Sequence, residues 1–305
     1  MSSLVIDYLV TGDGKALRYG FSRCGLTVPN GTVLLLQGRK EFLEKYAETV
    51  RDLNRKGYDV YSFDWRGQGL SERATADRIK GHVRDYREYL EDLRCFFERI
   101  ESVDAAPPRI MLAHSMGGHI GLRFLHDHPG SVDRALLTAP MIDISLPPLG
   151  KWIVGALCRA AVSSGFAEAL VPGAKNRNPL QRTFENNPLT SDPDRFEVEI
   201  RAIETNPDLL VGGMTFGWLA ASLNSIRVLR RPGYVEGIST PLRILTPELD
   251  RVVCPRAQID VCARMPRCRR IVIRGARHEV LMETDRIRAA VWKAFDDFVG
   301  PAFPV

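Results

Sequence analysis

The chain has 305 residues, of which 45% are hydrophobic and 26% are charged, and its formal net charge is +5. This composition is typical of a folded globular protein and excludes a disordered or fibrous chain. The basic residues are mostly arginines scattered among apolar residues, which favours solvated faces over a nucleic-acid-binding patch.

The sequence carries no strong signal for export or for membrane insertion. Its first residues, MSSLVIDYLVTGDGK, reach Asp7 and a glycine-rich turn too soon for a secretory signal peptide. The longest apolar stretch, residues 152–173, is interrupted by Arg159 and Glu168, whereas a membrane-spanning helix needs about 18 nearly uninterrupted apolar residues. We therefore expect a cytoplasmic protein, with peripheral contact at the inner face of a membrane left open.

The six cysteines show neither a CxxC pair nor a repeated spacing. This spacing predicts no disulfide framework and no zinc site, so free thiols are expected.

Short runs rich in β-branched and aliphatic residues alternate with longer helical patterns along the chain. The first two runs are a short turn apart, as an antiparallel hairpin requires, and the later ones have helix-length connections. This alternation predicts a mostly parallel α/β sheet with flanking helices. The eight predicted strands are residues 4–9, 16–22, 32–37, 58–64, 109–113, 134–139, 242–246 and 270–274.

Helical spacing of apolar residues predicts crossover helices at residues 41–57 and 82–100. The interval between the strands at 134–139 and 242–246 is far longer than an ordinary connection. It contains the apolar stretch 152–173, a polar segment rich in proline and asparagine, and a second amphipathic pattern at 214–230. We expect an inserted α-helical cap, with the core at residues 1–141 and 241–305 and the cap at 142–240.

Ser115 lies in the stretch RIMLAHSMGGHI, between the strand 109–113 and a helical pattern that starts at Gly117. A serine at a strand-to-helix turn is typical of a nucleophile elbow, whose usual pattern is G-x-S-x-G. Ala113 replaces the first glycine and is still small enough for the tight turn. A serine that only caps a helix is the structural alternative.

A serine nucleophile needs a general base and a group that orients this base. His278 follows the last predicted strand and Asp250 follows the strand before it, so both belong to the edge where parallel strands deliver functional loops. Glu248 is an alternative acid. His114 adjoins the serine, and we expect it to point to the opposite side of the turn.

A tetrahedral intermediate needs backbone N–H donors near its oxyanion. We expect the amide of Met116, directly after the serine, and the amide of Arg39, after Gly38 in the loop that follows the third strand. Many proteins with such a loop have His-Gly, and this chain has Gln37-Gly38.

The chain resembles the α/β-hydrolase superfamily of serine hydrolases, and within it the bacterial lysophospholipase L2 and monoacylglycerol lipase group. The resemblance covers most of the chain and is carried, in order, by segments such as LLLQGRKEFLEKY, FDWRGQGLSER, LAHSMGGHIGLRFL, LDRVV and GARHEVLMETDRIRAAVW. It implies the α/β-hydrolase fold, a triad of Ser115, Asp250 and His278, and monoacyl lipids as substrates. The chemistry requires neither a metal nor a cofactor.

The sequence therefore predicts a serine hydrolase that cleaves carboxylic esters of single-chain lipids through an acyl-enzyme. Apolar cap residues, of which Phe216 and Trp218 are candidates, would cover the acyl chain. A monoacylglycerol lipase or a general carboxylesterase is the enzymatic alternative, and a catalytically silent binding protein with the hydrolase fold is the alternative of another class. The sequence carries no pattern that sets an oligomeric state.

Overall fold

An eight-stranded sheet forms the centre of the molecule, with the strand order β1-β2-β4-β3-β5-β6-β7-β8. The computed structural model describes residues 4–103, 105–145, 150–173, 180 and 182–300. β2 pairs antiparallel with β1 and β4, and the other neighbours are parallel. The strands are β1 (Val5–Val10), β2 (Ala16–Ser22), β3 (Gly31–Leu36), β4 (Tyr58–Phe63), β5 (Arg109–His114), β6 (Arg134–Thr138), β7 (Leu242–Pro247) and β8 (Cys268–Ile273). The eight predicted strands thus exist, with ends shifted by one or two residues.

The central strands are buried on both faces. Every residue of β3 (GTVLLL) and β4 (YDVYSF) is buried, which is the continuous burial expected of a parallel sheet covered by helices on both sides. β1 is at the edge of the sheet, and there only Leu9 is buried. The carboxyl ends of the buried parallel strands are therefore the rigid base from which the loops of the candidate site project.

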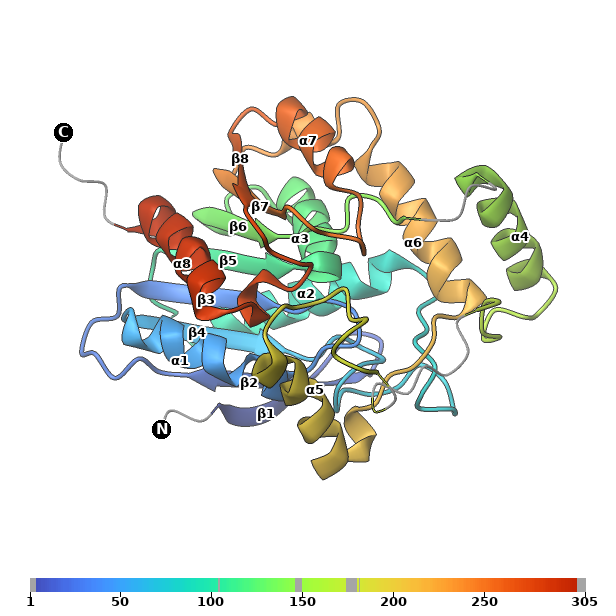
Figure 1. Ribbon diagram of the computed structural model, residues 1–305, viewed down its shortest axis with the longest axis horizontal. Helices are drawn as coiled ribbons and strands as arrows, with labels where there is room; N and C mark the ends of the chain where they lie inside the picture. The colour runs from blue at the N-terminus through green and yellow to red at the C-terminus, as the bar shows by residue number, and fades with distance from the viewer. Residues whose placement is uncertain (1–3, 104, 146–149, 174–179, 181, 301–305) are drawn as a thin grey trace.

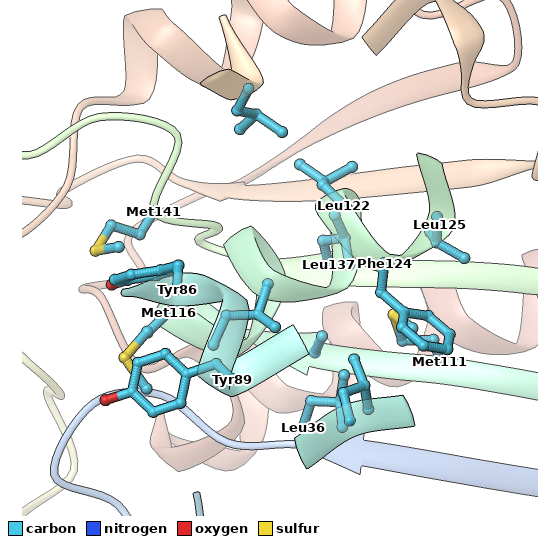
Figure 2. Close-up of a cluster of buried hydrophobic side chains, with 14 of the residues drawn as sticks. Leu36, Tyr86, Tyr89, Met111, Met116, Leu122, Phe124, Leu125, Leu137 and Met141 are labelled. Carbon is cyan, nitrogen blue, oxygen red and sulfur yellow. The ribbon is translucent and has the colours of Figure 1, made fainter. Parts of the chain in front are cut away.

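Helices cover the two faces of the sheet and bury a separate apolar cluster on each (Figure 1). α1 (Ala47–Arg55) and α8 (Asp285–Val299) pack on one face, and α2 (Tyr86–Glu101), α3 (Ser115–Asp127) and α7 (Pro255–Arg264) pack on the other. Figure 2 shows part of the larger cluster, in which Met116, directly after the elbow serine, lies among Tyr86, Tyr89 and Met141. The elbow therefore rests on a packed core.

The crossover helices begin later than their apolar patterns predict. The segment 82–100 becomes helical only at Tyr86, because the carboxylate of Asp85 caps the helix by accepting a hydrogen bond from the amide of Arg87 at 2.8 Å. The segment 41–57 forms a 3₁₀ turn, Leu43–Tyr46, before α1 starts at Ala47. Periodicity marks the apolar face, whereas capping side chains set the helix ends.

Between β6 and β7, the described residues form three α-helices, namely α4 (Lys151–Ser163), α5 (Pro193–Thr205) and α6 (Phe216–Leu229). α4 and α6 pack together at one end of the molecule, on the side away from the two termini (Figure 1). The sequence reading missed α5, although Asp192 caps it and Pro193 occupies its first turn, where proline is favoured. The described residues also include short 3₁₀ turns at Pro207–Leu209, Val235–Gly237 and Val280–Met282.

The prediction of free thiols is wrong for two cysteines. Cys262 near the end of α7 and Cys268 at the start of β8 form a disulfide, with their Cα atoms 5.4 Å apart. The tight turn between helix and strand brings them together, which a spacing of six residues does not reveal. Cys24, Cys95, Cys158 and Cys254 are free.

None of the helices in the described ranges is long and apolar enough to cross a bilayer.

Candidate active site

Ser115 is the first residue of α3 and follows β5 directly, in a strained backbone conformation with φ 49°. A positive φ is costly for a residue with a side chain and persists only where the surroundings enforce it. At Gly117, an added Cβ would lie 2.5 Å from the Gln37 carbonyl oxygen and 2.7 Å from that of Leu36. Helix and strand therefore approach so closely that position 117 requires glycine, as a nucleophile elbow does.

The structure brings Ser115, Asp250 and His278 together from loops after three different strands. His278 Nε2 lies 3.0 Å from Ser115 Oγ, and His278 Nδ1 lies 2.8 Å from Asp250 Oδ2. Ser115 and His278 are both buried. Glu248, the alternative acid, instead accepts a hydrogen bond from the amide of Gly275 at 2.8 Å. The geometry therefore favours Asp250 as the partner of the histidine.

The environment of Asp250 keeps its carboxylate ionised. Burial alone would raise the pKa of this group, but the hydrogen bond from His278 and the amides of Val252 and Val253 lower it below its ordinary value. An ionised carboxylate at Nδ1 fixes the imidazole tautomer that leaves Nε2 free to accept the serine proton.

The expectation for His114 is wrong, because its ring lies in the candidate site. Its centroid is 4.8 Å from that of His278, and the residue lines the same cavity as Ser115. Its Nδ1 lies 3.0 Å from Thr138 Oγ1, so β6 holds the ring at the inner side of the turn. Burial lowers the pKa of His114 to about 4, so the ring is neutral at neutral pH.

The loop after β3 is held in place by two side chains that the sequence reading did not single out. Gln68 Nε2 donates to the carbonyl of Gly38 at 3.1 Å, and Gln68 Oε1 accepts from the amide of Lys40 at 2.8 Å. The carboxylate of Glu41 accepts a hydrogen bond from the Gly38 amide. The peptide groups on both sides of Arg39 are therefore fixed. No residue-type pattern marks Gln68, which lies in the turn-rich loop after β4.

The two candidate oxyanion donors, the amides of Arg39 and Met116, donate no hydrogen bond to the described residues. Gln37, where many such loops have histidine, points into the sheet. It is fully buried, its Nε2 lies 3.3 Å from Ser62 Oγ, and its carbonyl accepts from the indole of Trp65 at 2.9 Å. The side chain and the backbone carbonyl of Gln37 thus tie the start of the loop to β4 and to Trp65, which follows that strand.

A cavity of about 640 Å³ opens above Ser115 and His278. Its apolar lining includes Met141, Ile144, Met214, Trp218, Val252 and Val253, and its polar lining includes Glu41, Lys45, Arg182, Asn187, Glu199 and Glu279. Of the two cap candidates, Trp218 lines the cavity and Phe216 is not among the described lining residues; Phe216 packs against the core cluster instead. The cavity thus combines an apolar wall with charged groups.

Lys45 forms a buried ion-pair cluster that the sequence did not predict. Its Nζ lies 2.9 Å from Glu41, 2.8 Å from Glu279 and 3.7 Å from Glu199. Burial would raise the pKa of Glu41, but Lys45 and His114 outweigh it and lower the pKa to about 2. The cluster joins the loop after β3, the residue after His278 and helix α5, so it connects three parts of the candidate site.

A mostly parallel sheet with an elbow serine that is hydrogen-bonded to a histidine, which is in turn hydrogen-bonded to an aspartate, defines the α/β-hydrolase class. Comparison with solved structures supports this fold. A soluble variant of monoglyceride lipase from Saccharomyces cerevisiae, in complex with a substrate analogue, matches with a TM-score of 0.76 at 19% identity, covering 98% of this chain and 96% of that one. A carboxyl esterase from Bacillus coagulans matches with a TM-score of 0.77 at 17% identity and 98% coverage of both chains. These likenesses establish the fold.

The chain belongs to the family described as "Serine aminopeptidase, S33", whose profile matches residues 27–285. Lysophospholipase L2 of Escherichia coli (strain K12) is 35% identical over 274 residues, which are 87% of this chain and 79% of that protein. Monoacylglycerol lipase of Mycolicibacterium smegmatis is 32% identical over 117 residues, which are 38% and 40% of the two chains. The α/β-hydrolase resemblance noted in the sequence is therefore confirmed.

Proposed function

We propose that this protein is a serine hydrolase that cleaves the carboxylic ester of a single-chain lipid, as a lysophospholipase does. The observation that carries the proposal is the hydrogen-bonded series Ser115, His278 and Asp250 beneath a cavity with an apolar wall. The similarity to lysophospholipase L2 over most of the chain supports the same substrate class. The family description names a peptidase, but an apolar wall next to the serine fits an acyl chain better.

In the proposed reaction, Ser115 Oγ attacks the ester carbonyl while His278 Nε2 takes its proton. Asp250 stabilises the imidazolium that forms. His278 then returns the proton to the departing glycerol oxygen as the ester C–O bond breaks, leaving the acyl group on Ser115. Water, activated by the same histidine, attacks this acyl-enzyme and releases the fatty acid and the free serine.

The oxyanion of both tetrahedral intermediates would be bound by the amides of Met116 and Arg39. Met116 is in the first turn of α3, where backbone N–H groups have no partner within the helix. The hydrogen bonds of Gln68 fix the peptides around Arg39 before substrate arrives. Such preorganised donors are among the largest contributions to catalysis of acyl transfer.

Residues 142–240 form the cap in this proposal, and residues 1–141 and 241–305 form the hydrolase core. Trp218 on α6 lines the cavity from the cap segment, and Met214 lies just before that helix. A roof of this kind would cover the acyl chain while the ester reaches Ser115. Part of the predicted cap and core, including residues 146–149, 174–179, 181 and 301–305, lies outside the described residues.

A substrate panel tests the proposal. Wild-type protein and Ser115→Ala are compared on lysophosphatidylcholine, monoacylglycerol, short-chain p-nitrophenyl esters and an aminoacyl p-nitroanilide. We expect hydrolysis of the lipid esters, little action on the anilide, and loss of activity in Ser115→Ala by about 10⁴-fold or more. Full activity of a folded Ser115→Ala protein, or failure of wild-type Ser115 to react with a fluorophosphonate probe, would contradict the proposal.

The protein would also contact a membrane peripherally through the apolar surface of α4. Trp152 and Leu157 on this helix are 77% and 62% exposed, and Phe166 just after it is 61% exposed. The helix, KWIVGALCRAAVS, contains two basic residues and no acidic one, which suits an anionic lipid surface. α4 packs against α6, which carries Trp218 of the cavity wall, so a docked membrane would lie near the helix that lines the cavity.

Vesicle co-sedimentation tests this contact. We expect binding to vesicles that contain phosphatidylglycerol and weaker binding by Trp152→Asp and Phe166→Asp. Val28→Asp is a matched control, because Val28 is 78% exposed but lies before β3, outside the cap segment. Equal binding by the wild type and the three variants would contradict the membrane contact. The cytoplasmic location expected from the sequence stays a prediction.

A further inference from the structure

Arg39 lines the cavity, and its guanidinium has no carboxylate partner among the described residues. Its Cζ lies 4.6 Å from the centre of the Trp218 ring, and its Nη2 lies 3.4 Å from the carbonyl of Gly212. Its Nε is buried and donates to none of the described residues. A guanidinium has five N–H donors, so most of the hydrogen-bonding capacity of this group is unused.

Two buried arginines of the described chain, Arg73 and Arg123, also lack a carboxylate partner among the described residues, whereas others are ion-paired. Arg18 contacts Glu44 at 2.8 Å, and Arg66 contacts Asp92 at 2.5 Å. Burial lowers the pKa of Arg39 to about 10, which leaves the group protonated at neutral pH. Arg39 is half-buried, so its guanidinium loses part of its hydration without gaining a counter-charge, and stacking on one indole offsets only part of this cost. Arg39 therefore lies in a position where an arriving anion would be stabilised.

The side chain of Arg39 starts close to the place where the ester carbonyl of the substrate would bind. The backbone amide of the same residue is the proposed oxyanion donor, so the side chain starts where the ester carbonyl would bind. In a lysophospholipid, the glycerol places a phosphodiester a few bonds from that carbonyl, which is comparable to the reach of an arginine side chain. Nη1 donates to none of the described residues, and Arg39 lines the cavity above Ser115.

We propose that the guanidinium of Arg39 binds the phosphodiester of a single-chain phospholipid and so selects lysophospholipids over uncharged monoacylglycerols. The inference rests on the proposed function, because it takes cleavage at Ser115 as given. Guanidinium N–H groups match phosphate oxygens in geometry and form charge-assisted hydrogen bonds with them. A monoacylglycerol in the same cavity would leave the cation unpaired.

The test is the ratio of kcat/KM for lysophosphatidylcholine to kcat/KM for a monoacylglycerol with the same acyl chain, both below their micellar concentrations. We expect Arg39→Met to lower this ratio by about 10- to 100-fold, the worth of a hydrogen bond between charged groups. Arg39→Lys, which keeps the charge and loses the planar fork, should lower it less.

Arg73→Met is the matched control. Arg73 is buried and, like Arg39, has no carboxylate partner among the described residues. Burial lowers its pKa to about 10, and its Nη2 donates to the carbonyl of Asp208 at 2.6 Å. It does not line the cavity above Ser115. We therefore expect Arg73→Met to keep the wild-type ratio. A ratio unchanged in folded Arg39→Met, or lowered equally in both variants, would overturn the inference.

Product analogues separate a lipid head group from free phosphate. Glycerophosphocholine should inhibit wild-type hydrolysis of p-nitrophenyl butyrate, and Arg39→Met should weaken this inhibition about 10-fold or more. Inorganic phosphate that inhibits the wild type as strongly as glycerophosphocholine would overturn the assignment to a lipid phosphodiester. A wild type that hydrolyses no ester of the panel would overturn the proposed function itself, which is a different result from an unchanged selectivity ratio.

Discussion

The side-chain amide of Gln68 is hydrogen-bonded on both sides of Arg39. It donates to the carbonyl of the residue before and accepts from the amide of the residue after, at 3.1 Å and 2.8 Å. One buried glutamine from the loop after β4 thus fixes the orientation of the peptide that would stabilise the oxyanion. Preorganisation of this kind spares the enzyme a rearrangement at the moment of reaction.

Gln68→Glu should lower kcat with little change in KM. The glutamate keeps an acceptor for the Lys40 amide, but it loses the donor to Gly38 and places a negative charge near the oxyanion. We expect kcat for p-nitrophenyl butyrate to fall about 10- to 100-fold, part of the loss seen when an oxyanion donor is removed. Steady-state kinetics beside a thermal melt checks this. An unchanged kcat would show that the two hydrogen bonds of Gln68 do not position the Arg39 amide.

Asp250→Asn should abolish most activity while leaving the fold intact. Asparagine fills the same space, but without the carboxylate the imidazole is no longer held in the tautomer that accepts the serine proton. We expect kcat to fall by about 10⁴-fold at neutral pH. The matched variant is Glu248→Gln, because this neighbouring acid bonds only to the Gly275 loop; it should retain near-normal kcat. Similar losses in both variants would contradict the assignment of the acid.

Trp218 and Phe216 are two residues apart, and only Trp218 lines the cavity. Trp218→Leu should therefore lower the ratio of kcat/KM for long-chain to short-chain p-nitrophenyl esters about 10-fold, which corresponds to roughly 1–2 kcal/mol of lost apolar contact. These esters are uncharged, so the measurement does not involve the phosphate selectivity of Arg39. Phe216→Leu should leave the ratio unchanged. A shift of equal size in both variants would argue against an acyl chain beside Trp218.

Acid should destabilise the fold through two buried histidines. Burial lowers the pKa of His114 to about 4 and that of His119 to about 3, so the unfolded chain binds protons below pH 6.5 that the folded chain does not. The contribution of these two histidines to the free energy of unfolding is therefore complete above pH 6.5 and falls as the pH approaches 4. Urea unfolding at pH 7, 6 and 5 measures this fall.

His119→Gln should flatten that pH dependence. Its Nδ1 lies 3.0 Å from the carbonyl oxygen of Met141, and its Nε2 lies 2.6 Å from Ser225 Oγ. The Ser225 hydroxyl can donate to Nε2 only while the imidazole is neutral. The variant will be less stable at pH 7, and it should lose less additional stability between pH 7 and pH 5 than the wild type. A wild-type midpoint that stays constant over this range would refute both expectations.

The sequence by itself determined the sheet, the elbow and the order of the loops. Aliphatic runs form buried parallel strands because a strand covered on both faces has no polar side, so their composition marks them directly. Small residues around Ser115 report a turn where helix and strand approach closely. The positions of Asp250 and His278 after later strands follow from the rule that parallel strands end at one edge.

Only the tertiary structure decided which side chains meet. Lys45 and Glu279 are 234 positions apart, and the clamp by Gln68, the inward position of His114 and the disulfide of Cys262 and Cys268 likewise depend on how separate elements pack. Periodicity and turn residues report local backbone preference, whereas ion pairs and hydrogen bonds between distant segments depend on distances of a few ångström that are set by the packed core. The unpaired guanidinium of Arg39 belongs to this second kind, because a missing partner is visible only once all neighbours are in place.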